Sequence, residues 1–185
     1  MSFLNFIIIS VVGPICAGKD ELASILVEKG FLRLSLADEL RGELDRRGVE
    51  ITRKNMQDVG DELRMKEGID FLAKRIVGRI EGNCVITGFR SPAEVKRLRE
   101  FGSKVLMVDA PFDLRFSRAV ERNREGEPLD LEGFRKMEER DLGIGQPEHG
   151  QQNAKCFELA DSIIVNDGSF NDLRERIDEV LNAIS

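Results

Sequence analysis

The chain has 185 residues, 41% of them hydrophobic and 34% charged, which predicts one compact domain with a buried core and excludes a disordered protein. Its 28 lysine and arginine residues against 34 acidic ones give a net charge of -6, so no overall basic field attracts nucleic acid or an anionic membrane. Three widely spaced cysteines and one histidine exclude a disulfide framework and a zinc site. We therefore expect a reduced, cytoplasmic setting.

The most apolar stretch, residues 3–12, is much shorter than the roughly 20 residues that span a bilayer. It also lacks the positively charged flank of a signal peptide. We interpret it as a buried strand, with no membrane partner expected.

Apolar runs alternate with amphipathic stretches along the chain. The runs predicted as strands are 7–12, 31–34, 84–87, 105–108 and 163–165. The segments predicted as helices are 20–28, 36–47, 54–66, 71–80, one that starts at Ser91-Pro92, 131–140 and 170–184. Continuous β-type runs are typical of parallel strands buried on both faces. The alternation predicts a three-layer α/β domain with a five-stranded parallel sheet.

Two helix starts have strong capping sequences. The first has Ser91 as the N-cap, Pro92 at the first helical position and Glu94 as the residue that completes a capping box. Ser169 is followed three residues later by Asp172 in the same relation. Both helices are expected to begin at these residues.

Residues 123–152 interrupt the apolar rhythm, because they are rich in Glu, Arg, Gly and Gln and contain Pro128 and Pro147. Such an insertion in an α/β domain is either a mobile lid or a surface excursion. One short helix, 131–140, is predicted within it.

The strongest motif is Gly13-Pro14-Ile15-Cys16-Ala17-Gly18-Lys19, which matches G-x-x-x-x-G-K between a predicted strand and a predicted helix. Its glycines let backbone N–H groups point inward, and the helix N-terminus adds its positive end. Lys19 supplies a charge for the β and γ phosphates. This P-loop predicts nucleotide binding.

Asp20 occupies the position where a serine or threonine usually binds magnesium. A carboxylate can hold this hard cation directly or through a water. The alternative is an acidic residue that only stabilises the first turn of a helix.

These features, in this order, resemble the P-loop nucleoside monophosphate kinase superfamily over nearly the whole chain. Gly18-Lys19-Asp20 is similar to the motif of phage deoxynucleoside monophosphate kinases and phosphomevalonate kinase. Segments 88–90, 160–161 and 165–168 resemble archaeal adenylate-kinase-related and dephospho-coenzyme-A-kinase-like proteins. The resemblance implies the cofactors ATP and Mg²⁺, an acceptor-binding helical region at 35–80 and a lid at 123–152. It also implies a set of nucleotide-binding residues: Gly13, Cys16, Ala17, Gly18, Lys19, Asp20, Glu21, Arg118, Asn166 and Gly168.

The segment Ser35 to Arg41 matches an S-x-x-D-x-x-R pattern that opens the acceptor-binding helix in adenylate-kinase-like enzymes. The resemblance assigns Asp38 and Arg41 to the acceptor, because the planar fork of an arginine suits a phosphate. The alternative is a capping box of Ser35 with Asp38, followed by a surface arginine.

Two further arginines are assigned to the acceptor phosphate by resemblance. Arg64 lies in a stretch similar to the acceptor region of phage deoxynucleotide kinases, and the alternative is a solvated amphipathic helix. Arg90 follows Gly88-Phe89 at the carboxyl edge of the sheet, where open α/β sheets bind ligands. Thr87 stands where the Walker B strand usually has an acid.

Asp109 begins a D-x-P-x-x-L-x-x-x-R-x-x-x-R pattern similar to that of adenylate kinases, which ends in Arg118 and Arg122. The resemblance places Arg118 on the adenine and Arg122 on the phosphates. Their spacing puts both on one helix face. The alternative is an exposed basic helix paired with nearby glutamates.

Phosphoryl transfer asks little covalent chemistry of a protein, so Lys19, Arg90 and Arg122 with magnesium are a sufficient catalytic set. We expect an ATP-dependent phosphotransferase acting on a nucleoside or deoxynucleoside monophosphate. Two alternatives stay open: phosphorylation of a hydroxyl, as in dephospho-coenzyme A kinases, and a P-loop ATPase or regulatory protein without a small-molecule acceptor. Small nucleotides are the expected partners and nucleic acid is not. The sequence does not encode the oligomeric state.

Overall fold

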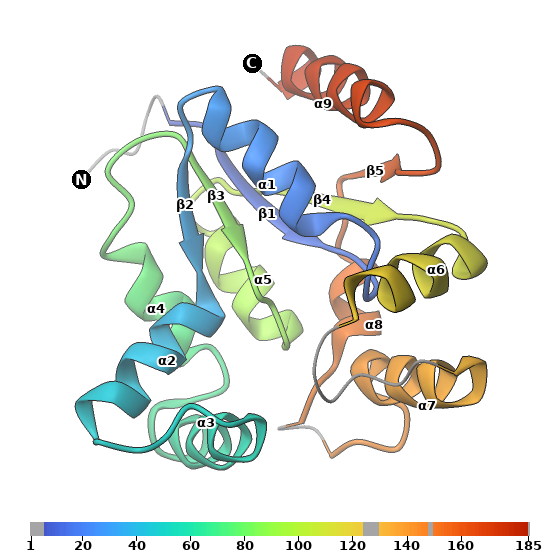
Figure 1. Ribbon diagram of the computed structural model, residues 1–185. Coiled ribbons are helices and arrows are strands. Elements are labelled where there is room, and N and C mark those ends of the chain that lie inside the picture. The colour runs from blue at the N-terminus through green and yellow to red at the C-terminus, as the bar shows by residue number, and fades with distance from the viewer. Residues whose placement is uncertain (1–5, 124–129, 148–149, 185) are drawn as a thin grey trace.

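The computed structural model describes residues 6–123, 130–147 and 150–184. Five parallel strands form one sheet in the order β2-β3-β1-β4-β5 (Figure 1). Their bounds are Ile8–Val12 (β1), Leu32–Ser35 (β2), Cys84–Thr87 (β3), Lys104–Asp109 (β4) and Ser162–Val165 (β5). The expected three-layer α/β architecture is confirmed.

The helices surround this sheet (Figure 1). Their bounds are Lys19–Glu28 (α1), Leu36–Arg46 (α2), Arg53–Glu67 (α3), Phe71–Val77 (α4), Pro92–Arg99 (α5), Phe112–Arg122 (α6), Leu131–Leu142 (α7), Asn153–Phe157 (α8) and Phe170–Ile184 (α9). The helix predicted over 71–80 ends earlier, at Val77, because Gly78 forms its C-cap and glycine is a poor helix former. Helix α8 was not predicted, since five residues are too few to show a period.

The sheet separates two apolar cores, and the side chains of β1 alternate between them. Ile8 and Val12 belong to the core under α2 to α5 and α8. Ile9 and Val11 belong to the core under α1 and α9. Burial of each such side chain contributes roughly 1.5–3 kcal/mol, so the strand is held from both faces.

The order of the strands creates the crevice in which open α/β sheets bind ligands. β1 and β3 are neighbours, with Ile9 opposite Val85 and Ser10 opposite Ile86. The chain leaves β1 for α1 on one face of the sheet and leaves β3 for α5 on the other (Figure 1). The carboxyl ends of these two strands therefore face a shared opening.

Both predicted capping sequences are confirmed. Ser91 and Glu94 form a complete capping box at the start of α5. Ser169 Oγ accepts a hydrogen bond from the Asp172 N–H at 3.2 Å, and Asp172 Oδ2 accepts one from the Ser169 N–H at 2.6 Å. Local hydrogen bonding thus fixes where α5 and α9 begin.

The insertion contains a well-packed helix. α7 runs two residues beyond its predicted end, and its Phe134 is fully buried, with ring centroids 5.5 Å from both Phe112 and Phe116 of α6. Residues 124–129 and 148–149, which the lid prediction includes, lie outside the described part of the chain. Among the described helices, none is long and apolar enough to cross a membrane.

Candidate active site

The P-loop fits so closely against its neighbours that two positions admit only glycine. A Cβ added to Gly13, whose φ is +144°, would lie 2.0 Å from the Val108 carbonyl oxygen. A Cβ on Gly18, with φ +106°, would lie 2.1 Å from the Asn166 amide nitrogen. Side chains at these positions would collide with β4 and with the loop after β5, so the glycines set the shape of the loop.

Lys19 is the first residue of α1, and its ammonium is held by the P-loop itself. Nζ donates to the carbonyl oxygens of Gly13 at 2.8 Å and Pro14 at 2.6 Å. Burial lowers the pKa of Lys19 below its ordinary value, and the nearby Asp141 carboxylate opposes this shift. The cation stands at the mouth of the loop, where the motif requires it.

Arg118 and Asn166 brace the far side of the P-loop. The Asn166 amide donates to the Ala17 carbonyl at 2.9 Å, and Arg118 Nη2 donates to the Asn166 carbonyl at 3.0 Å. Arg118 Nη1 also lies 3.4 Å from the carbonyl oxygens of Cys16 and Ala17. These two predicted residues therefore meet at the loop.

Other predicted nucleotide-binding residues lie farther out. Gly168 is two residues beyond Asn166 in the same loop, and Glu21 is an exposed residue of the first turn of α1. Arg122 is at the exposed end of α6, one turn beyond Arg118. It does not line the cavity described below.

Asp20 is 75% exposed at the start of α1 and forms an ion pair with Arg33 of β2. The described residues contain no cluster of three or more metal-binding side chains. Magnesium is commonly bound by one or two carboxylates together with substrate phosphates. The donor chemistry of Asp20 fits such an ion when phosphate oxygens complete the set.

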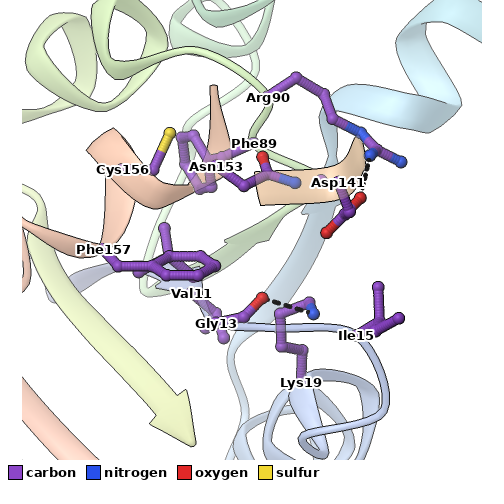
Figure 2. Close-up of a pocket in the computed structure, with 12 residues that line it drawn as sticks. Val11, Gly13, Ile15, Lys19, Phe89, Arg90, Asp141, Asn153, Cys156 and Phe157 are labelled. Carbon is purple, nitrogen blue, oxygen red and sulfur yellow. Dashed lines mark hydrogen bonds and ion pairs between the residues drawn. The ribbon is translucent and has the colours of Figure 1, made fainter. Parts of the chain in front are cut away.

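A cavity of about 130 Å³ opens between the P-loop, the loop after β3 and helices α7 and α8 (Figure 2). Lys19, Arg90 and Asp141 supply its charges, whereas Phe89 and Phe157 belong to its apolar wall. The remaining lining residues are Val11, Val12, Gly13, Ile15, Gly88, Asn153 and Cys156. The structure thus brings two of the three predicted catalytic residues, Lys19 and Arg90, to one cavity.

Arg90 joins the sheet edge to the insertion. Its Nη1 donates to Asp141 Oδ1 at 2.7 Å and to Gln151 Oε1 at 2.8 Å, and its carbonyl accepts from the Gln152 N–H at 2.8 Å. Its own N–H donates to Glu94 Oε2 at 2.8 Å. Arg90 is therefore fixed through both its backbone and its guanidinium.

Two buried oxygens beside this cavity have no hydrogen-bond partner among the described residues: Glu94 Oε1 and Asn153 Oδ1. Glu94 is fully buried, and burial raises the pKa of its carboxyl while hydrogen bonds from the Arg90 and Ser91 N–H groups oppose that rise. Asn153 is 6% exposed and lines the cavity. An unpaired buried oxygen costs free energy, so Asn153 offers an acceptor to a ligand that carries a donor.

The other predicted acceptor residues lie outside the cavity. Arg41 forms an ion pair with Asp38 at the exposed start of α2. Ser35 caps this helix by accepting from the Asp38 N–H at 3.3 Å, so the capping alternative holds for Ser35. Arg64 is almost fully buried and donates to Asp61 at 2.8 Å. Neither arginine lines the cavity that contains Arg90.

Three cavity residues, Asp141, Asn153 and Phe157, were missed by sequence reasoning. Asp141 belongs to a run of charged residues at the end of α7 and joins Arg90 from 51 residues away. No spacing rule singles out one charge in such a run. Its location in the insertion is the only sequence signal.

Comparison with known proteins identifies a matching domain family and similar relatives. Residues 9–143 match the AAA domain family. The chain is 32% identical to a UPF0200 protein of Methanosarcina barkeri, covering 95% of this chain and 94% of that protein. It is also 32% identical to a UPF0200/UPF0201 protein of Archaeoglobus fulgidus over 96% of this chain, but it spans only 56% of that relative's length.

Solved structures are similar in fold. A shikimate kinase from Acinetobacter baumannii superposes with a TM-score of 0.60 at 20% identity, covering 98% of this chain and 94% of that one. A dephospho-CoA kinase from Campylobacter jejuni gives 0.51 at 19% identity, covering 96% and 97%. Together with the P-loop geometry, these matches show that the chain belongs to the UPF0200 family and has the fold of the P-loop superfamily of nucleoside-monophosphate-kinase-like proteins.

Proposed function

We propose that the protein is a cytoplasmic, ATP-dependent phosphotransferase that moves the γ-phosphoryl group to a small phosphorylated acceptor, a nucleoside or deoxynucleoside monophosphate. One observation carries this proposal. Lys19 after β1 and Arg90 after β3 line the same cavity at the carboxyl edge of the sheet, so one cation can hold the donor phosphates while the other meets the group that receives them.

In this reaction the bond between the γ-phosphorus and the ADP oxygen breaks as a bond to an acceptor oxygen forms. Lys19 would hold the β and γ phosphates, and Asp20 would hold magnesium, which neutralises developing charge when bound. Arg118 would support the adenine and Arg122 the phosphates. A phosphate acceptor in its dianionic form needs no proton removed.

The acceptor arginines have carboxylate partners that a phosphate would replace. Arg41 is paired with Asp38, Arg64 with Asp61 and Arg90 with Asp141. Arg90 already lines the cavity, whereas Arg41 and Arg64 would reach it only if α2 and α3 moved toward it. Such closure around a substrate is usual for enzymes that must exclude water from phosphoryl transfer.

A second candidate, phosphorylation of a neutral hydroxyl, is favoured by the far wall of the cavity. The Asn153 oxygen is buried and has no hydrogen-bond partner among the described residues, and Phe157 and Phe89 line the same cavity. This wall suits an acceptor with an apolar body and a hydrogen-bond donor. The fold similarity to dephospho-CoA kinase and shikimate kinase makes dephospho-coenzyme A and shikimate sensible acceptors to test.

ADP release from ATP should be measured with a panel of nucleoside and deoxynucleoside monophosphates, dephospho-coenzyme A, shikimate and no acceptor, with products identified by phosphorus NMR. We expect a monophosphate to accelerate ADP release and to appear as the diphosphate. Acceleration by a hydroxyl acceptor alone would support the second candidate. Equal ADP release with and without every acceptor would contradict both and indicate a P-loop ATPase.

A further inference from the structure

Asp141 is an anion placed between two cations of the phosphate-binding site. Its Oδ1 lies 2.7 Å from Arg90 Nη1, and its side chain is 16% exposed. Figure 2 shows the carboxylate between the Arg90 guanidinium and the Lys19 ammonium, on the cavity side of α7. No other carboxylate lines this cavity among the described residues.

The surroundings explain why a negative group is stable there. Lys19 and Arg90 line the cavity beside it, and the apolar side chains of Phe89 and Phe157 form part of the same lining. Asp141 is largely buried and Arg90 is partly exposed, so the attraction between them is stronger than that of a fully solvated pair. The subsite therefore favours an anion of any kind with oxygen acceptors, and a phosphoryl group is the anion that the P-loop beside it would bring.

We propose that Asp141 stands in for the transferred phosphoryl group when the site is empty, and gives up Arg90 to that group when ATP binds. This inference rests on the proposed function. Two negative groups cannot share the subsite without strong repulsion. ATP binding and the pairing of Asp141 with Arg90 would then be mutually exclusive, and the carboxylate would act as a built-in competitor of the γ-phosphate.

The helix that carries Asp141 does not depend on this ion pair for its position. Phe134 packs into α6, Glu138 forms an ion pair with Arg115, and Arg140 donates to Gln57 of α3 at 3.0 Å. Replacement of Asp141 by asparagine keeps the size of the side chain and one oxygen that can accept from Arg90, and it removes the negative charge. The variant should therefore fold and isolate the electrostatic effect.

The test is Asp141→Asn in the full chain, with equilibrium binding of ATP and of ADP measured by calorimetry in the presence of magnesium. We expect the dissociation constant for ATP to fall about tenfold, because one like charge next to the γ-phosphate is removed. ADP, which lacks that phosphate, should change much less. Unchanged or weaker ATP binding would overturn the proposal, and so would an equal gain for ADP.

Glu132→Gln is the matched control, since Glu132 lies on the same helix, is 78% exposed and pairs with Lys136. It removes one negative charge without touching the cavity, and its ATP affinity should equal that of the unmodified protein. Asp141→Glu, which keeps the charge, should retain the weaker binding. An unmodified protein that binds ATP but phosphorylates no acceptor would contradict the proposed function and leave this comparison valid.

Discussion

At the level of single residues, Lys19 contacts the P-loop and takes no part in the apolar core. Among the described residues, its ammonium donates to the carbonyl oxygens of Gly13 and Pro14 in its own loop, while the aliphatic core under α1 is formed by other residues such as Leu22 and Ile25. The loss of Lys19 should therefore remove function without removing the fold.

Lys19→Ala is expected to abolish phosphoryl transfer and to change the thermal midpoint by only a few degrees. Turnover and thermal unfolding should be measured together. Lys29→Ala, at the other end of α1 and paired with Asp178 at 2.5 Å, is the control and should turn over normally. Normal turnover of Lys19→Ala would remove the basis of the P-loop assignment.

Asp20 gives a second prediction at this scale. If its carboxylate binds magnesium, Asp20→Ser should keep activity with an altered preference between magnesium and manganese, whereas Asp20→Ala should need more magnesium. Arg33→Gln, which removes the ion-pair partner of Asp20, controls for that contact and should leave the metal curve nearly unchanged. Identical metal titrations for all these proteins would exclude a metal role.

At the level of elements, two contacts place α7 over the site. The Phe134 ring packs against the α6 rings of Phe112 and Phe116. Arg115 donates to the Ala110 carbonyl at 2.9 Å and pairs with Glu138 of α7. α7 thereby presents Asp141 to Arg90. The docking of the whole helix α7 against α6 therefore determines whether Asp141 reaches the cavity.

Phe134→Ala should destabilise this packing by about 3 kcal/mol, the usual cost of deleting a buried phenyl ring. Hydrogen exchange of the α7 amides should become faster, and turnover should fall because Arg90 loses the contacts with Gln151 and Gln152 that hold it at the cavity. Leu131→Ala, an exposed position of the same helix, should leave both measurements unchanged. Protected α7 amides in Phe134→Ala would show that other contacts dock the helix.

At the level of the whole molecule, one carboxylate ties together the helical region beside the site. Glu43 of α2 accepts from Arg47 Nε at 2.8 Å and from Arg75 Nη1 of α4 at 2.9 Å, and it also pairs with Arg46 at 2.7 Å. The hydrogen bond from Arg47, followed by that from Arg75, lowers the pKa of Glu43 below its ordinary value of 4.5. Its ionised form is therefore favoured in the folded protein.

This lowered pKa has a defined effect on stability. The unfolded chain binds a proton at Glu43 more readily than the folded protein does, so the contribution of Glu43 is complete well above pH 4.5 and is lost as the pH falls below it. Glu94, whose pKa is raised by burial, changes stability in the opposite direction on acidification.

Glu43→Gln should therefore lower the thermal midpoint by about 4 °C at neutral pH and by progressively less as the pH falls below 4.5, because the unfolded native chain then binds a proton at Glu43. Thermal unfolding across this pH range tests the expectation. Glu62→Gln, which removes a 52% exposed partner of Arg47, should have a small effect. A pH-independent loss in Glu43→Gln would mean that its packing, not its charge, stabilises the region.

The sequence by itself determined the features that depend on nearby residues. The P-loop, the order of strands and helices, and the capped starts of α5 and α9 follow from spacings of a few residues, because turns, caps and burial patterns are satisfied within one element or between successive ones. The position of Arg90 at the carboxyl edge of the sheet could also be predicted, because Arg90 comes soon after the end of β3.

Only the tertiary structure decided which charges share the cavity. Asp141 meets Arg90 across 51 residues and Gln151 meets it across 61, while Arg41 and Arg64, predicted for the same acceptor, pair with carboxylates on their own helices. Many charged residues in this chain have similar neighbours in the sequence, and their spacing does not show which of them line the cavity. Their partners are selected by how α7 and α8 pack against the sheet, and this packing follows from long-range burial of Phe134 and Cys156 that no short motif encodes.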